Sequence, residues 1–263
     1  MHSAYGRRGP WLWAAALAAY VFLYLPLLIV IIYSFNDSRL NAEWVGFTWH
    51  WYNVLLHDED MLAAAGNSLL IATVASLAAT ILGTMAGIAM HRYKMKVLTF
   101  MVMTPVAMPE ILLGVSLLLF FIQVLNLTLG MVSIMLAHIT FSIGFVAVVV
   151  RTSLAGLNES MFEAARDCGA SPWETFRYIT FPLILPSIIA GGLMAFTLSL
   201  DDFVITFFTA GVGVSTLPLR IYSMIKIAVT PEVNAVSTLL MLLTLALIVL
   251  ASRIAPNVLR WRA

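Results

Sequence analysis

Six apolar runs, each long enough to cross a membrane, constrain this chain more than any other feature. A hydrocarbon core of about 30 Å is crossed by about 20 helical residues. With 62% apolar and only 10% charged residues, the composition is not that of a soluble domain. Because backbone groups inside lipid must pair within their own segment, we predict an all-α polytopic protein with six transmembrane helices. The runs are Trp11–Tyr33, Asn67–Met90, Val97–Val124, Leu127–Val150, Leu183–Thr209 and Val233–Ile254.

The first run continues well past the length of a signal peptide, and no polar cleavage region follows it, so we interpret it as a retained helix. We expect three parts in the chain. Residues 1–66 form an N-terminal helix with an external loop, residues 67–256 form a five-helix core, and residues 257–263 form a cytoplasmic tail.

The distribution of lysine and arginine predicts the orientation. Eleven of the 14 basic residues fall on one side, which places both termini in the cytoplasm. These are Arg7, Arg8, Arg92, Lys94, Lys96, Arg151, Arg166, Arg177, Arg253, Arg260 and Arg262, against Arg39, Arg220 and Lys226 on the other side. The external loop from Asn36 to Gly66 is acidic. Its run Asp58-Glu59-Asp60 would concentrate cations, contact another protein, or simply be solvated.

Proline and small residues mark special places inside the apolar runs. Gly83 and Gly87 form a GxxxG pattern, and Gly191-Gly192 is a second small-residue pair, so we expect close helix packing at both. Two proline pairs, Pro105 with Pro109 and Pro182 with Pro186, predict kinks in the third and fifth spans.

A polar island between the fourth and fifth runs predicts a compact helix-turn-helix knob. Ser160-x-x-Glu163 has the pattern of a capping box that opens a short helix, and Gly169 is placed to end it. The sequence from Ser171 to Glu174 repeats the device, with proline at the first helical position. An ordinary amphipathic loop helix is the alternative.

The spacing of this island resembles the cytoplasmic EAA loop of permease subunits of bacterial ATP-binding-cassette (ABC) importers. That loop reads Glu-Ala-Ala-x3-Gly-x9-Ile-x-Leu-Pro, and this chain departs from it only in having Phe181 at the leucine position. The resemblance covers residues 158–182 and implies a type I ABC importer permease fold. It also implies that the knob is a coupling helix, which sits in a groove of a separate ATPase subunit. The coupling residues would be Glu163, Ala164, Ala165, Gly169, Ser171, Pro172 and Trp173.

The sequence offers no catalytic constellation. It contains no GxxxxGK[ST] phosphate loop, and its five histidines have no metal-ligand spacing. We therefore expect no enzyme, no metal site and no cofactor in this chain, with ATP and Mg bound by a partner ATPase. The single cysteine, Cys168, lies in the knob and is expected to stay reduced in the cytoplasm.

Three carboxylates lie inside the apolar runs, where an ionised group costs about 2.5 to 3.5 kcal/mol on insertion scales. They are Glu110, Asp201 and Asp202. No lysine or arginine in the spans is available to pair with them, which favours a cationic substrate over a structural ion pair. Adjacent helical residues point about 100° apart, so we expect only one aspartate to face the pathway while the other caps, pairs or meets the partner subunit. Phe196 and Phe203 flank the pair, as cation partners or as core packing.

A narrower resemblance covers nearly the whole chain. The segments that carry it are Tyr33–Asn36 leading into Trp51-Tyr52, Phe196–Val204, Thr216–Met224 and Thr230–Ala235. They look like the second permease subunit of spermidine/putrescine importers. The implied partners are a homologous permease, an ATPase dimer, a periplasmic or lipoprotein substrate-binding protein and membrane lipid, with no nucleic acid. A permease for another amine or small solute, and a secondary transporter driven by an ion gradient, are the alternatives.

Overall fold

The computed structural model describes residues 10–38, 43–228 and 230–254, and its regular elements there are all helical. The first half of the chain forms α1 (Pro10–Tyr33), α2 (His50–His57), α3 (Glu59–Tyr93), α4 (Lys96–Ala107), α5 (Glu110–Leu119), the π-helical turn η1 (Phe120–Val124) and α6 (Met131–Ala155). The second half forms α7 (Glu159–Asp167), α8 (Pro172–Thr175), the π-helical turn η2 (Phe176–Thr180), α9 (Phe181–Leu200), α10 (Val204–Thr209), α11 (Leu217–Ile227) and α12 (Pro231–Ile254).

Within the described residues, five helical segments are long and apolar enough to cross a membrane. They are Trp11–Tyr33, Glu59–Tyr93, Met131–Ala155, Pro172–Leu200 and Pro231–Leu250, and the pair α4 and α5 makes a sixth if taken as one bent span. The predicted all-α membrane protein is thus confirmed. The predicted tail 257–263 and five of the basic residues used for orientation lie outside the described residues; these are Arg7, Arg8, Arg39, Arg260 and Arg262.

The helices belong to two compact units. One contains the described residues up to Glu59 together with Ile221–Leu242, and the other contains Asp60–Arg220 with the described residues from Leu243 onward. The second unit holds the knob and the carboxylates of the third and fifth apolar runs, Glu110, Asp201 and Asp202, so it positions the candidate site.

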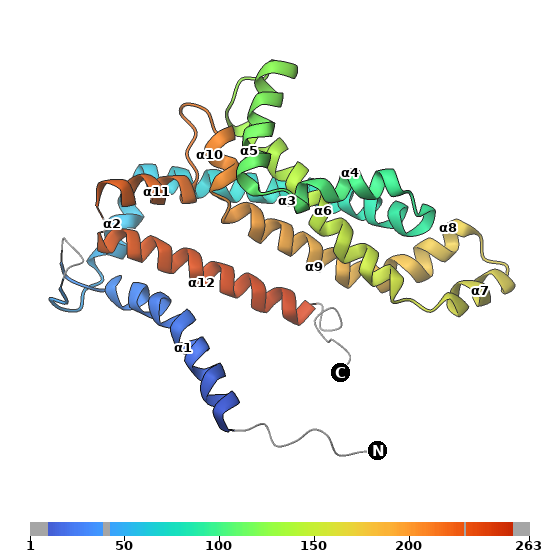
Figure 1. The fold of residues 1–263 in the computed structure, drawn as a ribbon, viewed down its shortest axis with the longest axis horizontal. Helices are drawn as coiled ribbons and strands as arrows, with labels where there is room; N and C mark the ends of the chain where they lie inside the picture. Colours follow the sequence, from blue (N-terminus) through green and yellow to red (C-terminus); the bar gives the residue numbers. More distant parts are fainter. Residues whose placement is uncertain (1–9, 39–42, 229, 255–263) are drawn as a thin grey trace. The chain divides into compact units, whose positions relative to one another are not determined.

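The third predicted span is broken at Met108-Pro109. Helices α4 and α5 meet there at 110°, and Figure 1 shows α5 turning away from the direction of α4. A residue before proline avoids the helical region, and Met108 accordingly has φ −79° and ψ 143°. The predicted kink is therefore a full break. As a result, Glu110 occupies the first turn of a new helix rather than the middle of an old one.

The fifth predicted span differs from the structure at both ends. It extends back to Pro172, because α8 continues through η2 into α9. In η2 the amide of Phe181 donates to the carbonyl of Phe176, five residues back, just before Pro182, which has no amide proton to offer. At the other end, α9 stops at Leu200 and α10 begins at Val204. The expected uninterrupted helix Leu183–Thr209 is thus wrong, since the chain breaks at the two aspartates.

Small residues allow α3 and α6 to approach closely. A Cβ atom on Gly83 would lie 2.6 Å from Val146 Cβ and 2.9 Å from the carbonyl oxygen of Ile143. On Gly87 it would lie 2.8 Å from the carbonyl oxygen of Ala147. Val146 also belongs to the buried cluster in which α6 packs against α9. The GxxxG pattern is therefore a packing face, as predicted.

Candidate functional site

The first helix of the knob, α7, begins differently from the prediction. Asn158 is the N-cap, and its side-chain oxygen accepts a hydrogen bond from the amide of Ser160 at 3.1 Å. Ser160 lies inside the helix, so the predicted capping box from Ser160 to Glu163 is wrong. An asparagine side chain can satisfy a first-turn amide from outside the helix, and Asn158 precedes Ser160 by two residues. Glu163 is consequently free of a capping role and is exposed.

The end of α7 follows the prediction. Gly169 has φ +83°, a conformation that favours glycine. The amide of Gly169 donates to the carbonyl of Arg166 at 2.9 Å, and that of Ala170 donates to the carbonyl of Ala165 at 3.0 Å. These two bonds define a Schellman motif, which closes the helix and sets the direction of the chain into α8.

The second helix of the knob, α8, opens with the predicted capping box. Ser171 accepts from the amide of Glu174 at 3.3 Å, and Glu174 Oε2 accepts from the amide of Ser171 at 2.8 Å. Pro172 takes the first helical position. Trp173 stacks at a tilt on Phe176, with ring centroids 5.7 Å apart. Both helices of the knob are thus fixed by local hydrogen bonds.

The knob exposes a mixed surface built from the predicted coupling residues. Glu163, Ala164 and Trp173 are exposed, and Trp173 keeps 64% of its surface accessible. Ala165, by contrast, is buried. Ala165 therefore packs inside the knob, whereas the other three side chains are available to another protein.

At the break after α9, a buried polar network holds Asp202. Its carboxylate accepts from the amide and the hydroxyl of Thr206, at 2.8 and 2.9 Å, so Asp202 caps α10. His138 of α6 lies beneath it, with Nε2 3.3 Å from Asp202 Oδ2 and 3.0 Å from Thr206 Oγ1. The other ring nitrogen of His138 lies 2.6 Å from Ser199 Oγ. His138 is 2% exposed, and no motif in the sequence predicts its role. The signal available was a single imidazole inside an apolar span, where polar groups are costly.

Asp201 lies in a different environment from Asp202. It follows the last residue of α9 and is exposed. Glu110, also exposed, opens α5. Helix α5 packs against α10. Two helix breaks from distant parts of the sequence thus bring Asp201 and Glu110 to one region.

Aromatic residues flank the break after α9. Phe203 stacks at a tilt on Phe207, with ring centroids 5.6 Å apart, and Phe196 is half-buried in α9.

The segments around Ser34 and Trp51, which carry part of the sequence resemblance, lie together in the first unit. The hydroxyl oxygens of Ser34 and Tyr52 lie 2.7 Å apart, and Trp51 Nε1 donates to the carbonyl of Asn36 at 2.8 Å. The Asn36 side chain is fully buried and bonds to the backbone of Glu43 and Val45. In the second unit, Asp60 pairs with Arg220 at 3.1 Å, which links two residues predicted to lie on the external side.

The described residues contain no cluster of three or more histidine, cysteine, aspartate or glutamate side chains that could hold a metal ion. The one strong polar cluster, around His138, has a single carboxylate whose oxygens are engaged in capping. The second unit has a helix-turn-helix knob and carboxylates at a helix break.

Solved structures with the same fold are membrane transporters. A bacterial ABC transporter involved in the import of alginate matches with a TM-score of 0.72 over 95% of this chain and 96% of its own, at 16% identity. The MetNI methionine ABC transporter matches with a TM-score of 0.64 over 77% of this chain and 100% of its own, at 19% identity. The fold is that of a type I ABC importer permease.

The chain belongs to the family of binding-protein-dependent transport system inner membrane components, whose model matches residues 79–261. It is 44% identical over 243 residues to the putrescine transport system permease protein PotI of Escherichia coli K12, covering 89% of this chain and 86% of that protein. It is 42% identical to the spermidine/putrescine transport system permease protein PotC of Haemophilus influenzae, covering 89% and 92%. The chain is thus a multi-helix transport permease and not an enzyme.

Proposed function

We propose that this chain forms half of the translocation pathway of an ATP-driven importer of polyamines such as putrescine and spermidine. The observation that carries this proposal is the break after α9. Asp201 is an exposed carboxylate at that break, and Glu110 is a second exposed carboxylate at the start of α5, which packs against α10. The polyamine permeases among the relatives support the substrate class.

The chemistry of the break suits a substrate with several ammonium groups. Two carboxylates from separate helices replace part of the hydration of a dication, and flanking aromatic faces attract ammonium groups. In this proposal Asp201 and Glu110 meet the substrate, with Phe196 and Phe203 lining the passage. Asp202 shapes the same site by capping α10. A site open to water holds the substrate weakly enough to release it, as transport requires.

The link between the knob and the break is a nearly continuous helical path. The segment Pro172–Leu200 runs from the capping box of α8 to the residue before Asp201. At about 1.5 Å per residue, its α9 part alone is about 30 Å long. A movement imposed on the knob by an ATPase would therefore be carried to the carboxylates by one stiff element. The exposed Glu163, Ala164 and Trp173 would form the ATPase contact, with Gly169, Ser171 and Pro172 fixing its shape.

The assembly we infer contains a homologous permease, two ATPase subunits that bind ATP and Mg, and a periplasmic or lipoprotein substrate-binding protein. The knob and both termini would face the cytoplasm, because basic residues concentrate there. A binding protein would dock on the acidic external side. The core domain would extend over residues 67–256, with residues 1–66 as an added helix and loop.

Transport by the reconstituted complex tests this function. Proteoliposomes would contain the chain with the permease and ATPase encoded beside it, ATP inside and loaded binding protein outside. We expect putrescine or spermidine to accumulate only with ATP and the binding protein present. Accumulation driven by an ion gradient without the ATPase would contradict the proposal. Uptake of an uncharged solute in preference to both polyamines would contradict the substrate assignment.

A further inference from the structure

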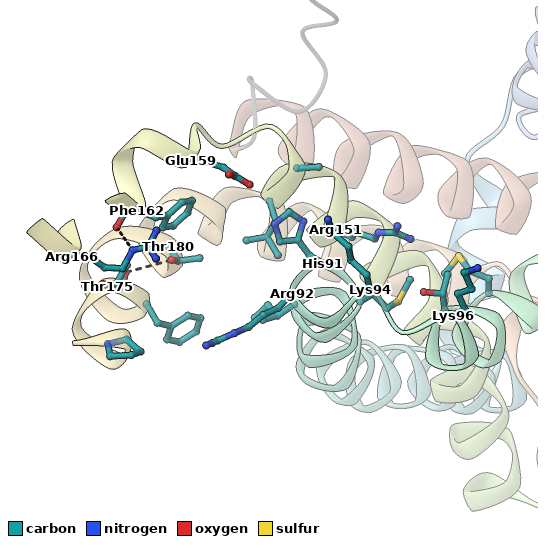
Figure 2. A pocket seen from close by; sticks show the side chains of 18 of the residues that line it. His91, Arg92, Lys94, Lys96, Arg151, Glu159, Phe162, Arg166, Thr175 and Thr180 are labelled. Carbon is teal, nitrogen blue, oxygen red and sulfur yellow. Dashed lines mark hydrogen bonds between the residues drawn. The ribbon is translucent and has the colours of Figure 1, made fainter. Parts of the chain in front are cut away.

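A basic pocket of about 1380 Å³ lies between the knob and the neighbouring ends of α3, α4 and α6. Figure 2 shows His91, Arg92, Lys94 and Lys96, from the end of α3 and the start of α4, together with Arg151 of α6 and Arg166 of α7. The turn from α3 to α4 is sharp, since Lys94 adopts φ 49°. This turn therefore places Arg92, Lys94 and Lys96, which lie within five residues of sequence, in the lining of one pocket.

The positive charge of this pocket is not neutralised by the chain's own carboxylates. Arg92, Lys94, Lys96, Arg151 and Arg166 have no ion pair with a carboxylate among the described residues. Glu159 is the only acid in the lining. A concave site with five cations and one acid has a strong positive potential, which attracts an anion.

The pocket continues into an apolar surface along α4. Phe100 lines the pocket and is also 73% exposed. Val97 and Met101 beside it on α4 are 70% and 67% exposed. Cations therefore lie at the start of α4, and the next turn of α4 exposes apolar side chains. Tyr93, exposed at the same turn, is typical of the headgroup level of a membrane.

We propose that this pocket binds the headgroup of an anionic phospholipid, with the acyl chains lying against α4. Basic pockets between spans on the cytoplasmic side suit such headgroups. The bound headgroup would offset part of the positive charge that α3, α4, α6 and α7 bring to the pocket. This site is separate from the proposed polyamine pathway and does not depend on the substrate.

An acidic segment of the ATPase is the other class of occupant. The lipid is favoured because the apolar surface of α4 adjoins the cations. An acidic protein segment would leave that apolar surface uncovered. Inorganic phosphate would satisfy the charge but not that surface either. The experiment therefore compares phosphatidylglycerol with phosphatidylcholine of the same acyl chains and with inorganic phosphate.

The test is lipid binding by the purified transporter complex, titrated and read by native mass spectrometry. The variant is Lys96→Gln with Arg151→Gln. The matched control is Arg177→Gln with Arg253→Gln, which removes two basic residues outside the pocket lining. Each cation near an anionic lipid contributes about a fivefold factor, so we expect the pocket variant to bind phosphatidylglycerol roughly 30-fold more weakly. The control should bind like the wild type, and phosphatidylcholine should bind weakly to all three.

Several results would overturn the proposal. These are equal binding of both lipids by the wild type, an equal loss in the control, or inorganic phosphate displacing phosphatidylglycerol at low millimolar concentration. Loss of the ATPase from the pocket variant with unchanged lipid binding would assign the pocket to the protein partner instead. If the double variant does not assemble, Lys96→Gln alone should still weaken phosphatidylglycerol binding about fivefold.

Discussion

Asp201 and Asp202 are neighbours in the sequence and have different surroundings in the fold. Asp202 caps α10 and faces the buried His138, whereas Asp201 is exposed near Glu110. A carboxylate engaged by an amide, a hydroxyl and an imidazole is held by the protein. One that is exposed beside another acid is available to a cationic ligand. The two residues should therefore respond differently to the same substitution.

We predict that Asp201→Asn lowers polyamine uptake while the complex assembles normally. The asparagine keeps the shape and a carbonyl acceptor but removes the charge. The loss should be larger for spermidine, with three ammonium groups, than for putrescine, with two. Uptake of both amines, divided by the amount of assembled complex, is the measurement. Asp202→Asn is the comparison, and it should reduce the amount of stable complex for every substrate alike, because a buried hydrogen-bonded carboxylate is worth about 1 to 3 kcal/mol.

Normal assembly and wild-type uptake by both asparagine variants would remove the aspartates from the pathway. A loss of uptake in Asp201→Asn that is equal for the two amines would also count against a role in charge recognition.

A second prediction at this scale concerns Gly169. Gly169→Leu should uncouple transport from ATP hydrolysis or disassemble the complex, because φ +83° costs a branched residue about 1 to 2 kcal/mol. Space is not the reason, since a Cβ atom there would meet nothing within 4 Å. Gly169→Asn is the matched control, because asparagine tolerates this conformation and should retain most activity. Substrate-stimulated ATPase activity and uptake at wild-type levels in Gly169→Leu would show that this turn is not needed for coupling.

At the scale of elements, helix breaks and close contacts determine what the spans can do. Carboxylates are exposed at the 110° bend between α4 and α5 and at the break after α9. The helical path through α8, η2 and α9 joins the break after α9 to the knob. These elements can move together only if α3, α6 and α9 pack rigidly against one another. Gly83 of α3 and Val146 of α6 are central to that packing.

We predict that Gly83→Ala lowers the stability of the purified complex by about 1 to 3 kcal/mol, the usual cost of overpacking. Its Cβ atom would lie 2.9 Å from a backbone oxygen, which cannot move aside easily. Gly66→Ala, in the same helix but with nothing within 4 Å, is the control and should be neutral or gain up to about 1 kcal/mol. The midpoint of thermal unfolding measures both. Equal midpoints would mean that the α3–α6 contact does not limit stability.

At the scale of the whole molecule, orientation decides whether the knob can meet an ATPase at all. Arg92, Lys94, Lys96, Arg151 and Arg166 gather around one pocket next to the knob. The pair of Asp60 and Arg220 joins two residues expected on the external side. The orientation itself stays a prediction.

We predict that reporters fused after Ala263 and after Glu59 report opposite sides of the membrane. An enzyme that is active only in the periplasm should be active at Glu59 and inactive at Ala263, and a cytoplasmic reporter should give the reverse. Periplasmic activity at Ala263 would invert the topology. It would also place the knob away from any cytoplasmic ATPase and remove the coupling proposal.

The sequence alone determined the class of fold, the existence of the apolar spans and most of the knob. These depend on local quantities, namely the length of an apolar run, the preference of glycine for positive φ, and the reach of Ser171 and Glu174 toward each other's amides. The family followed from the same local pattern, because the spacing of the EAA loop lies within one short segment.

The tertiary structure alone decided how the carboxylates are used. His138 meets Thr206, 68 residues away, and thereby helps hold Asp202, a pairing that no local pattern contains. The tertiary structure also set the break after Leu200, where α10 packs against α5 and α6. The basic pocket likewise collects cations from four helices. Contacts between distant segments depend on how the helices pack, and hydropathy and capping rules carry no information about that.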